Sequence, residues 1–157
     1  MSSNLAPIAV FCFRRLDLIK KLISSIKRNS LSKDSPIFFF IDSPKHKYQK
    51  KEVNKIIQFL KEISYFKKKK IIIRNKNYGV KNNILKGVSH IFNKFDKVIV
   101  LEDDLEISKN FLYAMNKLLK IHRENKDIFT ITGYAPSNIE LNLKLRNDFF
   151  LCKRPSS

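Results

Sequence analysis

Residues 98–106, with the sequence VIVLEDDLE, constrain this chain more than any other stretch. Four apolar residues lead directly into three consecutive carboxylates. An apolar run of this length, bounded by polar residues, is typical of a strand buried on both faces of a parallel sheet. Charge beside a core costs desolvation free energy, so carboxylates at such a strand end are seldom there for stability. The stretch therefore predicts a ligand-binding strand end, because open α/β sheets bind ligands at the carboxyl ends of their strands.

The rest of the chain alternates short apolar runs with segments of helical periodicity. Strands are expected at residues 7–13, 36–41, 70–74 and 98–101, and further strands at residues 128–132 and 149–152. The four helices expected between or after them have these apolar residues: Leu18, Ile19, Leu22, Ile23 and Ile26; Val53, Ile56, Ile57, Leu60 and Ile63; Ile84, Leu85, Val88, Ile91 and Phe92; Phe111, Leu112, Met115, Leu118 and Leu119. Ser108 is the expected N-cap of the last helix. This order predicts an α/β fold with a mainly parallel sheet flanked by helices.

The charge of the chain is strongly positive. The 157 residues carry a formal net charge of +18. A charge of this size favours anionic partners such as phosphates, nucleic acids or acidic membrane surfaces. A lysine-rich composition also arises from drift in nucleotide composition, so both explanations stay open at this point.

Cysteine use and the hydropathy pattern suggest a cellular compartment. Cys12 lies within an apolar run and is expected to be a buried free thiol, and Cys152 is the only other cysteine. Neither a disulfide framework nor a cysteine metal motif is present. The N-terminal sequence does not resemble a signal peptide, and no apolar stretch is long enough to span a bilayer. We expect a cytoplasmic protein, with at most peripheral contact at the inner face of the plasma membrane.

Polar residues also follow the other expected strands. Arg14 follows the first strand and Asp42 follows the second, so both belong to the same sheet edge as the acidic residues. An arginine can pair with a phosphate, and an aspartate can accept from a pyrimidine imide or a ribose hydroxyl. Taken singly, each is explained equally well as a surface salt bridge or a turn residue. Gly79 permits a tight turn after the third strand, and Lys81 follows it as a polar candidate.

The acidic residues suggest a metal ion. If the extended geometry continues past the strand, Glu102 and Asp104 project to one side and Asp103 to the other. Mg²⁺ and Mn²⁺ commonly take one or two carboxylates together with substrate phosphates. The cluster therefore predicts Mn²⁺ or Mg²⁺ with a bound diphosphate, and an exposed acidic turn is the competing interpretation. A P-loop and a GxGxxG fingerprint are both missing from the sequence.

Four segments together resemble a known family. FCFRR with Arg14, FFIDS with Asp42, VLEDDLEISKNFL and FTITGYAPSN resemble the GT-A fold glycosyltransferases, in particular bacterial relatives of N-acetylglucosaminyltransferase I, of the family 2/13 type. The third segment is similar to a variant of the family's DXD metal motif. By this resemblance the fold is a Rossmann-like nucleotide-sugar-binding half, and Asp104 is the metal ligand.

The resemblance also implies a reaction. Glu102 and Asp103 would face the sugar and ribose of the donor, and Lys81 would lie near its diphosphate. The implied activity is metal-dependent hexosyl or N-acetylhexosaminyl transfer from a nucleoside-diphosphate sugar, UDP-linked, to a glycan or lipopolysaccharide-type acceptor. Such activity belongs to bacterial cell-envelope polysaccharide synthesis. Residues 1–157 are expected to form one GT-A-like donor-binding domain, with the acceptor-binding half and the general base beyond Ser157; Asp148 is the nearest late carboxylate, but the resemblance does not assign it that role.

Two other functions were weighed against this one. A basic nucleic-acid-binding α/β domain without enzymatic activity would use the +18 charge directly. However, most phenylalanines lie in apolar runs and are not interleaved with lysine and arginine as stacking platforms are, so no nucleic acid is expected. A receiver-like or phosphohydrolase domain needs an acidic pair after the first strand, and Phe13-Arg14-Arg15 stands there instead.

Overall fold

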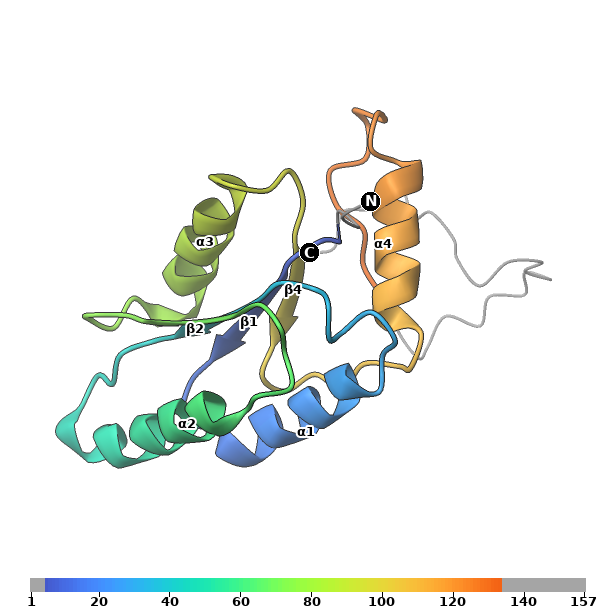
Figure 1. Ribbon diagram of the computed structural model, residues 1–157. Coiled ribbons are helices and arrows are strands. Elements are labelled where there is room, and N and C mark those ends of the chain that lie inside the picture. The colour runs from blue at the N-terminus through green and yellow to red at the C-terminus, as the bar shows by residue number, and fades with distance from the viewer. Residues whose placement is uncertain (1–4, 134–157) are drawn as a thin grey trace, which may run out of the picture.

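The computed structural model describes residues 5–133, which form a parallel sheet with helices on both faces (Figure 1). The elements follow in this order: β1 (Ile8–Cys12), α1 (Leu16–Lys27), β2 (Ile37–Ile41), the 3₁₀ helix η1 (Lys47–Gln49), α2 (Lys50–Glu62), β3 (Lys69–Ile73), α3 (Gly79–Phe92), β4 (Ile99–Glu102) and α4 (Phe111–Ile121). The predicted α/β fold with a mainly parallel sheet is therefore confirmed.

The sheet has the strand order β3-β2-β1-β4, and all neighbouring strands are parallel. Ile8 on β1 lies opposite Ile37 on β2 and Ile99 on β4, so the strands start and end nearly in register. In-register parallel strands end together. Each loop that leaves a carboxyl end therefore emerges at one edge of the sheet, which we call the carboxyl edge.

Both faces of the sheet are buried because successive side chains point to opposite sides. Val10 and Phe39 belong to the larger core, which α1, α2 and α4 cover. Phe11 and Phe40 belong to the smaller core beneath α3, and their rings stack with centroids 5.1 Å apart. Figure 1 shows α3 on the opposite side of the sheet from α1 and α2.

A glycine brings α3 unusually close to the sheet. A Cβ atom at Gly87 would lie 2.6 Å from Cζ of Phe11 and 3.2 Å from Cδ2 of Phe40. The buried stripe of α3 is consequently narrow: Asn83, Gly87 and Ile91. Leu85 and Phe92, which were expected to face the core, are instead more than half exposed, because only one helix lies on this face of the sheet among the described residues.

One expected strand is not formed. Residues 128–132 contain no strand, and the side chain of Phe129 is fully exposed. An apolar run needs a ladder partner to become a strand, and β4 pairs only with β1 within residues 5–133. The expected strand at residues 149–152 lies outside the described residues.

The connection from the acidic residues to α4 is held by α1. Ser108 was expected to cap α4, but the helix begins at Phe111 and no cap side chain bonds to its N-terminus. Instead, Oδ1 of Asn29, just after the end of α1, accepts from the backbone N–H of Leu112 at 3.0 Å and so satisfies an amide that the helix itself leaves open. Oγ of Ser25 accepts from Ile107 N–H at 3.1 Å. The loop after β4 is thus fixed at two points.

Candidate functional site

The structure places most of the predicted site residues at the carboxyl edge. Arg14 follows β1, Asp42 follows β2, and Asp103 and Asp104 follow β4, which ends at Glu102. Parallel pairing brings these loops together because β1 lies between β2 and β4. Lys81 lies further along the same edge, in the first turn of α3.

The extended geometry expected for the acidic residues ends at Glu102. Asp103 and Asp104 form a turn, in which the N–H of Leu105 donates to the carbonyl of Glu102 at 3.3 Å. The three side chains differ in exposure: Asp103 is buried, with 2% of its surface exposed, whereas Glu102 and Asp104 are exposed.

Asp103 joins the ends of β4 and β1. Its Oδ2 accepts from the backbone N–H of Phe13 at 3.1 Å, and its Oδ1 accepts from Nη2 of Arg15. A buried carboxylate is costly unless it is paired and hydrogen-bonded, and here both conditions are met. Partial burial lowers the pKa of Arg15, but the hydrogen bonds and charges of Asp103 and Asp104 outweigh it, so the pKa of the guanidinium lies above its ordinary value.

Asp104 shares the same arginine but remains accessible. Nη1 of Arg15 donates to Oδ2 of Asp104 at 3.1 Å, and 48% of the Asp104 side chain is exposed. Within residues 5–133, Oδ1 of Asp104 has no hydrogen bond and Glu102 has no ion pair. The carboxylate oxygens that remain available to a ligand therefore belong to Asp104 and Glu102.

Arg14 takes a different direction from Arg15. Its φ is +64°, in the left-handed region, which costs a residue with a side chain about 1–2 kcal/mol. Its Nε donates to Oε2 of Glu52 on α2 at 2.6 Å, and this hydrogen bond raises the pKa of the Arg14 guanidinium. From the sequence, Arg14 was predicted as a site residue and Arg15 was not. Nothing in the sequence gives the sign of φ at residue 14, so no local signal distinguishes the two arginines.

Asp42 is a buried carboxylate that fixes the start of α3. Its Oδ1 accepts from the N–H groups of Ser43 and Tyr78, both at 2.9 Å, and its Oδ2 accepts from Gly79 N–H at 2.9 Å. Gly79 has a φ of +73°, and no atom lies within 4 Å of the position its Cβ would take. The turn therefore needs glycine for its backbone conformation and not for space, as the sequence suggested.

Arg74 and Tyr78 form a cationic and aromatic cluster that the sequence analysis missed. The Arg74 guanidinium lies 5.2 Å from the ring centroid of Phe40 and 5.7 Å from that of Tyr78. Its Nε donates to Oδ1 of buried Asn83 at 2.8 Å. Nζ of Lys86 also lies 5.2 Å from the Tyr78 centroid. Arg74 stands at the end of the expected third strand, so the criterion that identified Arg14 and Asp42 applies to it as well.

Lys81 is exposed and makes no ion pair within the described part of the chain. Its position in the first turn of α3 puts a cation near the amides that Asp42 binds. Two hollows are described on the surface, one along η1 and α2 and the other between the end of α1 and the start of α4.

The carboxylates of the carboxyl edge fit a divalent cation that takes part of its coordination from a ligand. Residues 5–133 contain no group of three or more His, Cys, Asp or Glu side chains arranged to hold a metal alone. Mg²⁺ and Mn²⁺ do not require such a cage, because substrate phosphates and water complete their coordination. An accessible Asp104 with one oxygen available fits a cation that is shared with a diphosphate.

Comparison with known proteins gives one clear match. The family model described as glycosyl transferase family 2 matches residues 8–155, which is nearly the whole chain. No curated protein matches the sequence significantly. Among the described residues, no helix is long and apolar enough to cross a membrane.

Proposed function

We propose that this chain, which belongs to glycosyltransferase family 2, binds a UDP-sugar through Mn²⁺ or Mg²⁺ on Asp104. Family membership makes it a glycosyltransferase with a nucleotide-sugar donor and an acceptor. The metal, the uridine nucleotide and the acceptor class are the proposal. It rests mainly on the pairing of a buried Asp103 with an accessible Asp104 at the end of β4.

Each side chain of the edge has a distinct proposed role. Asp104 holds the cation, which neutralises the charge that develops on the departing diphosphate. Glu102 is exposed beside it and is proposed to accept hydrogen bonds from the donor sugar. Asp103 is proposed to face the ribose, which requires Arg15 to leave its Oδ1, while its Oδ2 holds the turn in place through Phe13. Lys81 is proposed to approach the diphosphate from α3.

The nucleotide base is proposed to lie beside β2 and β3. Asp42 retains acceptor capacity, because each carboxylate oxygen has two lone pairs and three backbone donors are already bound. Tyr78 offers a ring on which a planar base can stack. Arg14 is held by Glu52 in this structure, so a role at the phosphate requires that ion pair to open.

The finer assignment follows the resemblance to bacterial relatives of N-acetylglucosaminyltransferase I. We propose hexosyl or N-acetylhexosaminyl transfer to a glycan or lipopolysaccharide-type acceptor in cell-envelope synthesis. The acceptor hydroxyl needs a general base, and no residue of the described chain is assigned that role.

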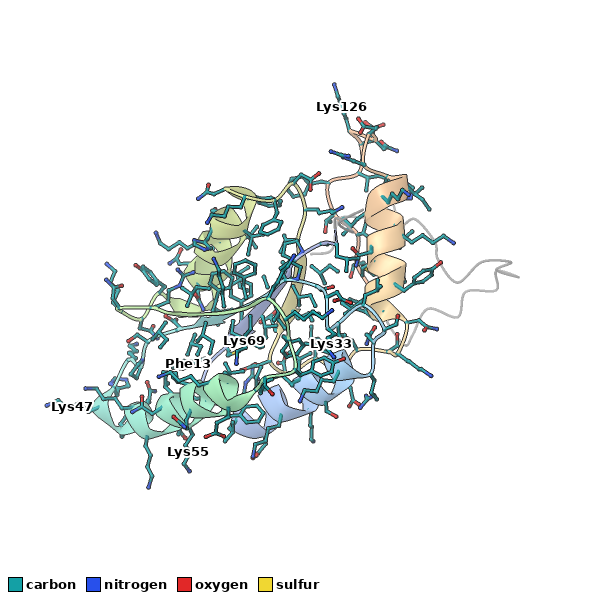
Figure 2. All side chains as sticks on the ribbon, viewed as in Figure 1. Phe13, Lys33, Lys47, Lys55, Lys69 and Lys126 are labelled. Carbon is teal, nitrogen blue, oxygen red and sulfur yellow. The ribbon has the colours of Figure 1, made fainter. Side chains whose placement is uncertain are left out.

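A basic surface supports peripheral contact with an anionic membrane from the cytoplasmic side. The hollow along η1 and α2 is lined by Lys47, Tyr48, Lys50, Lys51, Asn54, Lys55 and Gln58. Figure 2 shows Lys47 and Lys55 directed away from the sheet. None of these lysines forms an ion pair within residues 5–133, and the neighbouring Glu52 is taken by Arg14. Exposed lysines near an anionic membrane contribute about 1 kcal/mol each.

A thermal-shift experiment tests the proposed donor. UDP and Mn²⁺ together, near 100-fold above the dissociation constant, should stabilise the protein by about 2.7 kcal/mol and raise its melting temperature by roughly 5–10 °C. Mn²⁺ with a nucleoside that lacks phosphate is the control and should give no shift. Tight retention on a nucleic-acid column with a steep salt dependence, together with no response to UDP and Mn²⁺, would instead favour the nucleic-acid function.

A further inference from the structure

Arg15 is the cation that neutralises the acidic turn. Its two terminal nitrogens bind different carboxylates: Nη2 donates to Asp103, and Nη1 donates to Oδ2 of Asp104 at 3.1 Å. The guanidinium thus lies between the two aspartates, directly beside the carboxylate that is proposed to hold the metal.

The two contacts of Arg15 differ in environment. The Asp103 side chain is almost fully buried and also receives the Phe13 amide, so its carboxylate keeps a fixed position without help from solvent. Asp104 and Arg15 are each about half exposed, with 48% and 49% of their side chains accessible. The contact of Arg15 with Asp104 is therefore the one that a ligand from solvent can open.

Charge also favours the transfer of Arg15 from Asp104 to a bound diphosphate. A divalent cation on Asp104 repels the adjacent guanidinium, whereas a diphosphate bound to that cation attracts it. Arginine binds phosphate with two parallel hydrogen bonds in the same fork geometry that it uses here for carboxylates. Once released from Asp104, Arg15 therefore lies next to the diphosphate, which binds a guanidinium more strongly than a single carboxylate does.

We propose that Arg15 is a donor-binding residue that stays bound to the acidic turn until the donor arrives. When the metal and nucleotide bind, Arg15 releases Asp104 and its guanidinium moves to the diphosphate. This inference rests on the proposed metal-dependent donor binding and adds a residue that the DXD-like motif does not contain. Because Arg15 competes with the metal until the diphosphate arrives, metal alone binds weakly and the nucleotide strengthens its binding.

The test measures Mn²⁺ binding without nucleotide, using the electron paramagnetic resonance signal of free Mn²⁺ and the full chain. The variant Arg15→Gln removes the competing charge and should bind Mn²⁺ alone about tenfold more tightly, a factor typical of a charge-assisted hydrogen bond. With Mn²⁺ present, its affinity for UDP should fall by about tenfold, whereas its affinity for uridine should not change.

Arg28→Gln is the matched control. Arg28 donates to Oε1 of Glu106 at 2.9 Å and is as exposed as Arg15, but it does not touch Asp103 or Asp104. It should leave both affinities unchanged. If Arg15→Gln does not fold, as judged by its melting transition, Arg15→Lys serves instead; it keeps the charge but loses the fork, so UDP affinity should fall while Mn²⁺ affinity rises less than tenfold.

Unchanged or weaker Mn²⁺ binding in a folded Arg15 variant would overturn the inference. A wild-type protein that binds Mn²⁺ but not UDP would refute the proposed donor instead, while the Mn²⁺ comparison would still decide whether Arg15 competes with the metal.

Discussion

Oδ2 of Asp42 accepts a hydrogen bond from the backbone N–H of Gly79 at 2.9 Å and so ties the end of β2 to the first residue of α3. The negative charge lies at the N-terminus of the helix, where the helix dipole favours it. Two further amides bind the same carboxylate. A residue selected from the sequence as a nucleotide ligand is therefore also a structural element of the carboxyl edge.

The variant Asp42→Asn should lower the free energy of unfolding by about 1–3 kcal/mol, because one amide oxygen replaces two carboxylate oxygens and an NH₂ group meets a backbone donor. Urea denaturation measures the change. Asp34→Asn is the control, since Asp34 is exposed and pairs only with Lys67 at the surface; it should change stability by less than about 0.5 kcal/mol. Equal effects of the two substitutions would contradict a stabilising role for the hydrogen bonds of the buried Asp42 carboxylate.

Asp104→Ala should abolish the stabilisation that UDP and Mn²⁺ produce together, because the proposed cation loses its protein ligand. The measurement is the thermal shift of the ligand-saturated protein. Glu106→Ala removes another exposed carboxylate of the same loop, which pairs with Arg28 at the end of α1, and it should retain the shift. A full shift in Asp104→Ala would show that this aspartate does not hold the metal.

Gly87→Ala should destabilise the protein by about 1–3 kcal/mol, because the added methyl group meets the Phe11 ring, with Cζ only 2.6 Å away. Ser89→Ala, on the exposed side of the same helix, is the control and should have little effect. Circular dichroism melts of both variants provide the comparison. A neutral Gly87→Ala would mean that α3 can move away from the sheet without cost.

The thiol of Cys12 should not react with a disulfide reagent at pH 8 while the protein is folded. Burial, followed by the charge of Asp103, raises the pKa of Cys12 well above its ordinary value, so the thiol keeps its proton. In the variant Cys152→Ser, Cys12 is the one remaining cysteine, so labelling reports its exposure on unfolding. Urea should accelerate this labelling. Above about pH 8.5 the unfolded thiol loses a proton that the folded thiol retains, so stability should fall as pH rises. Rapid labelling without urea would refute the buried position.

The triple variant Lys50→Glu, Lys51→Glu, Lys55→Glu should weaken binding to anionic liposomes by at least about 100-fold, since each lysine near such a surface contributes about 1 kcal/mol. Co-sedimentation with vesicles of increasing anionic lipid content measures the loss. The matched control replaces Lys117, Lys120 and Lys126, which are exposed on or after α4, and makes the same change in net charge. Similar losses in both variants would point to nonspecific charge and not to the surface along α2.

Apolar runs and helical periodicity by themselves determined the four strands, the helices between them and the edge at which Arg14, Asp42 and the acidic residues meet, because parallel connectivity forces strand ends together. Only the tertiary structure decided which arginine reaches Asp103. That choice depends on one positive φ at residue 14 and on contacts between residues about 90 positions apart. Likewise, residues 128–132 have a strand-like pattern but no ladder partner among the described residues, and a strand requires the hydrogen bonds of a neighbour.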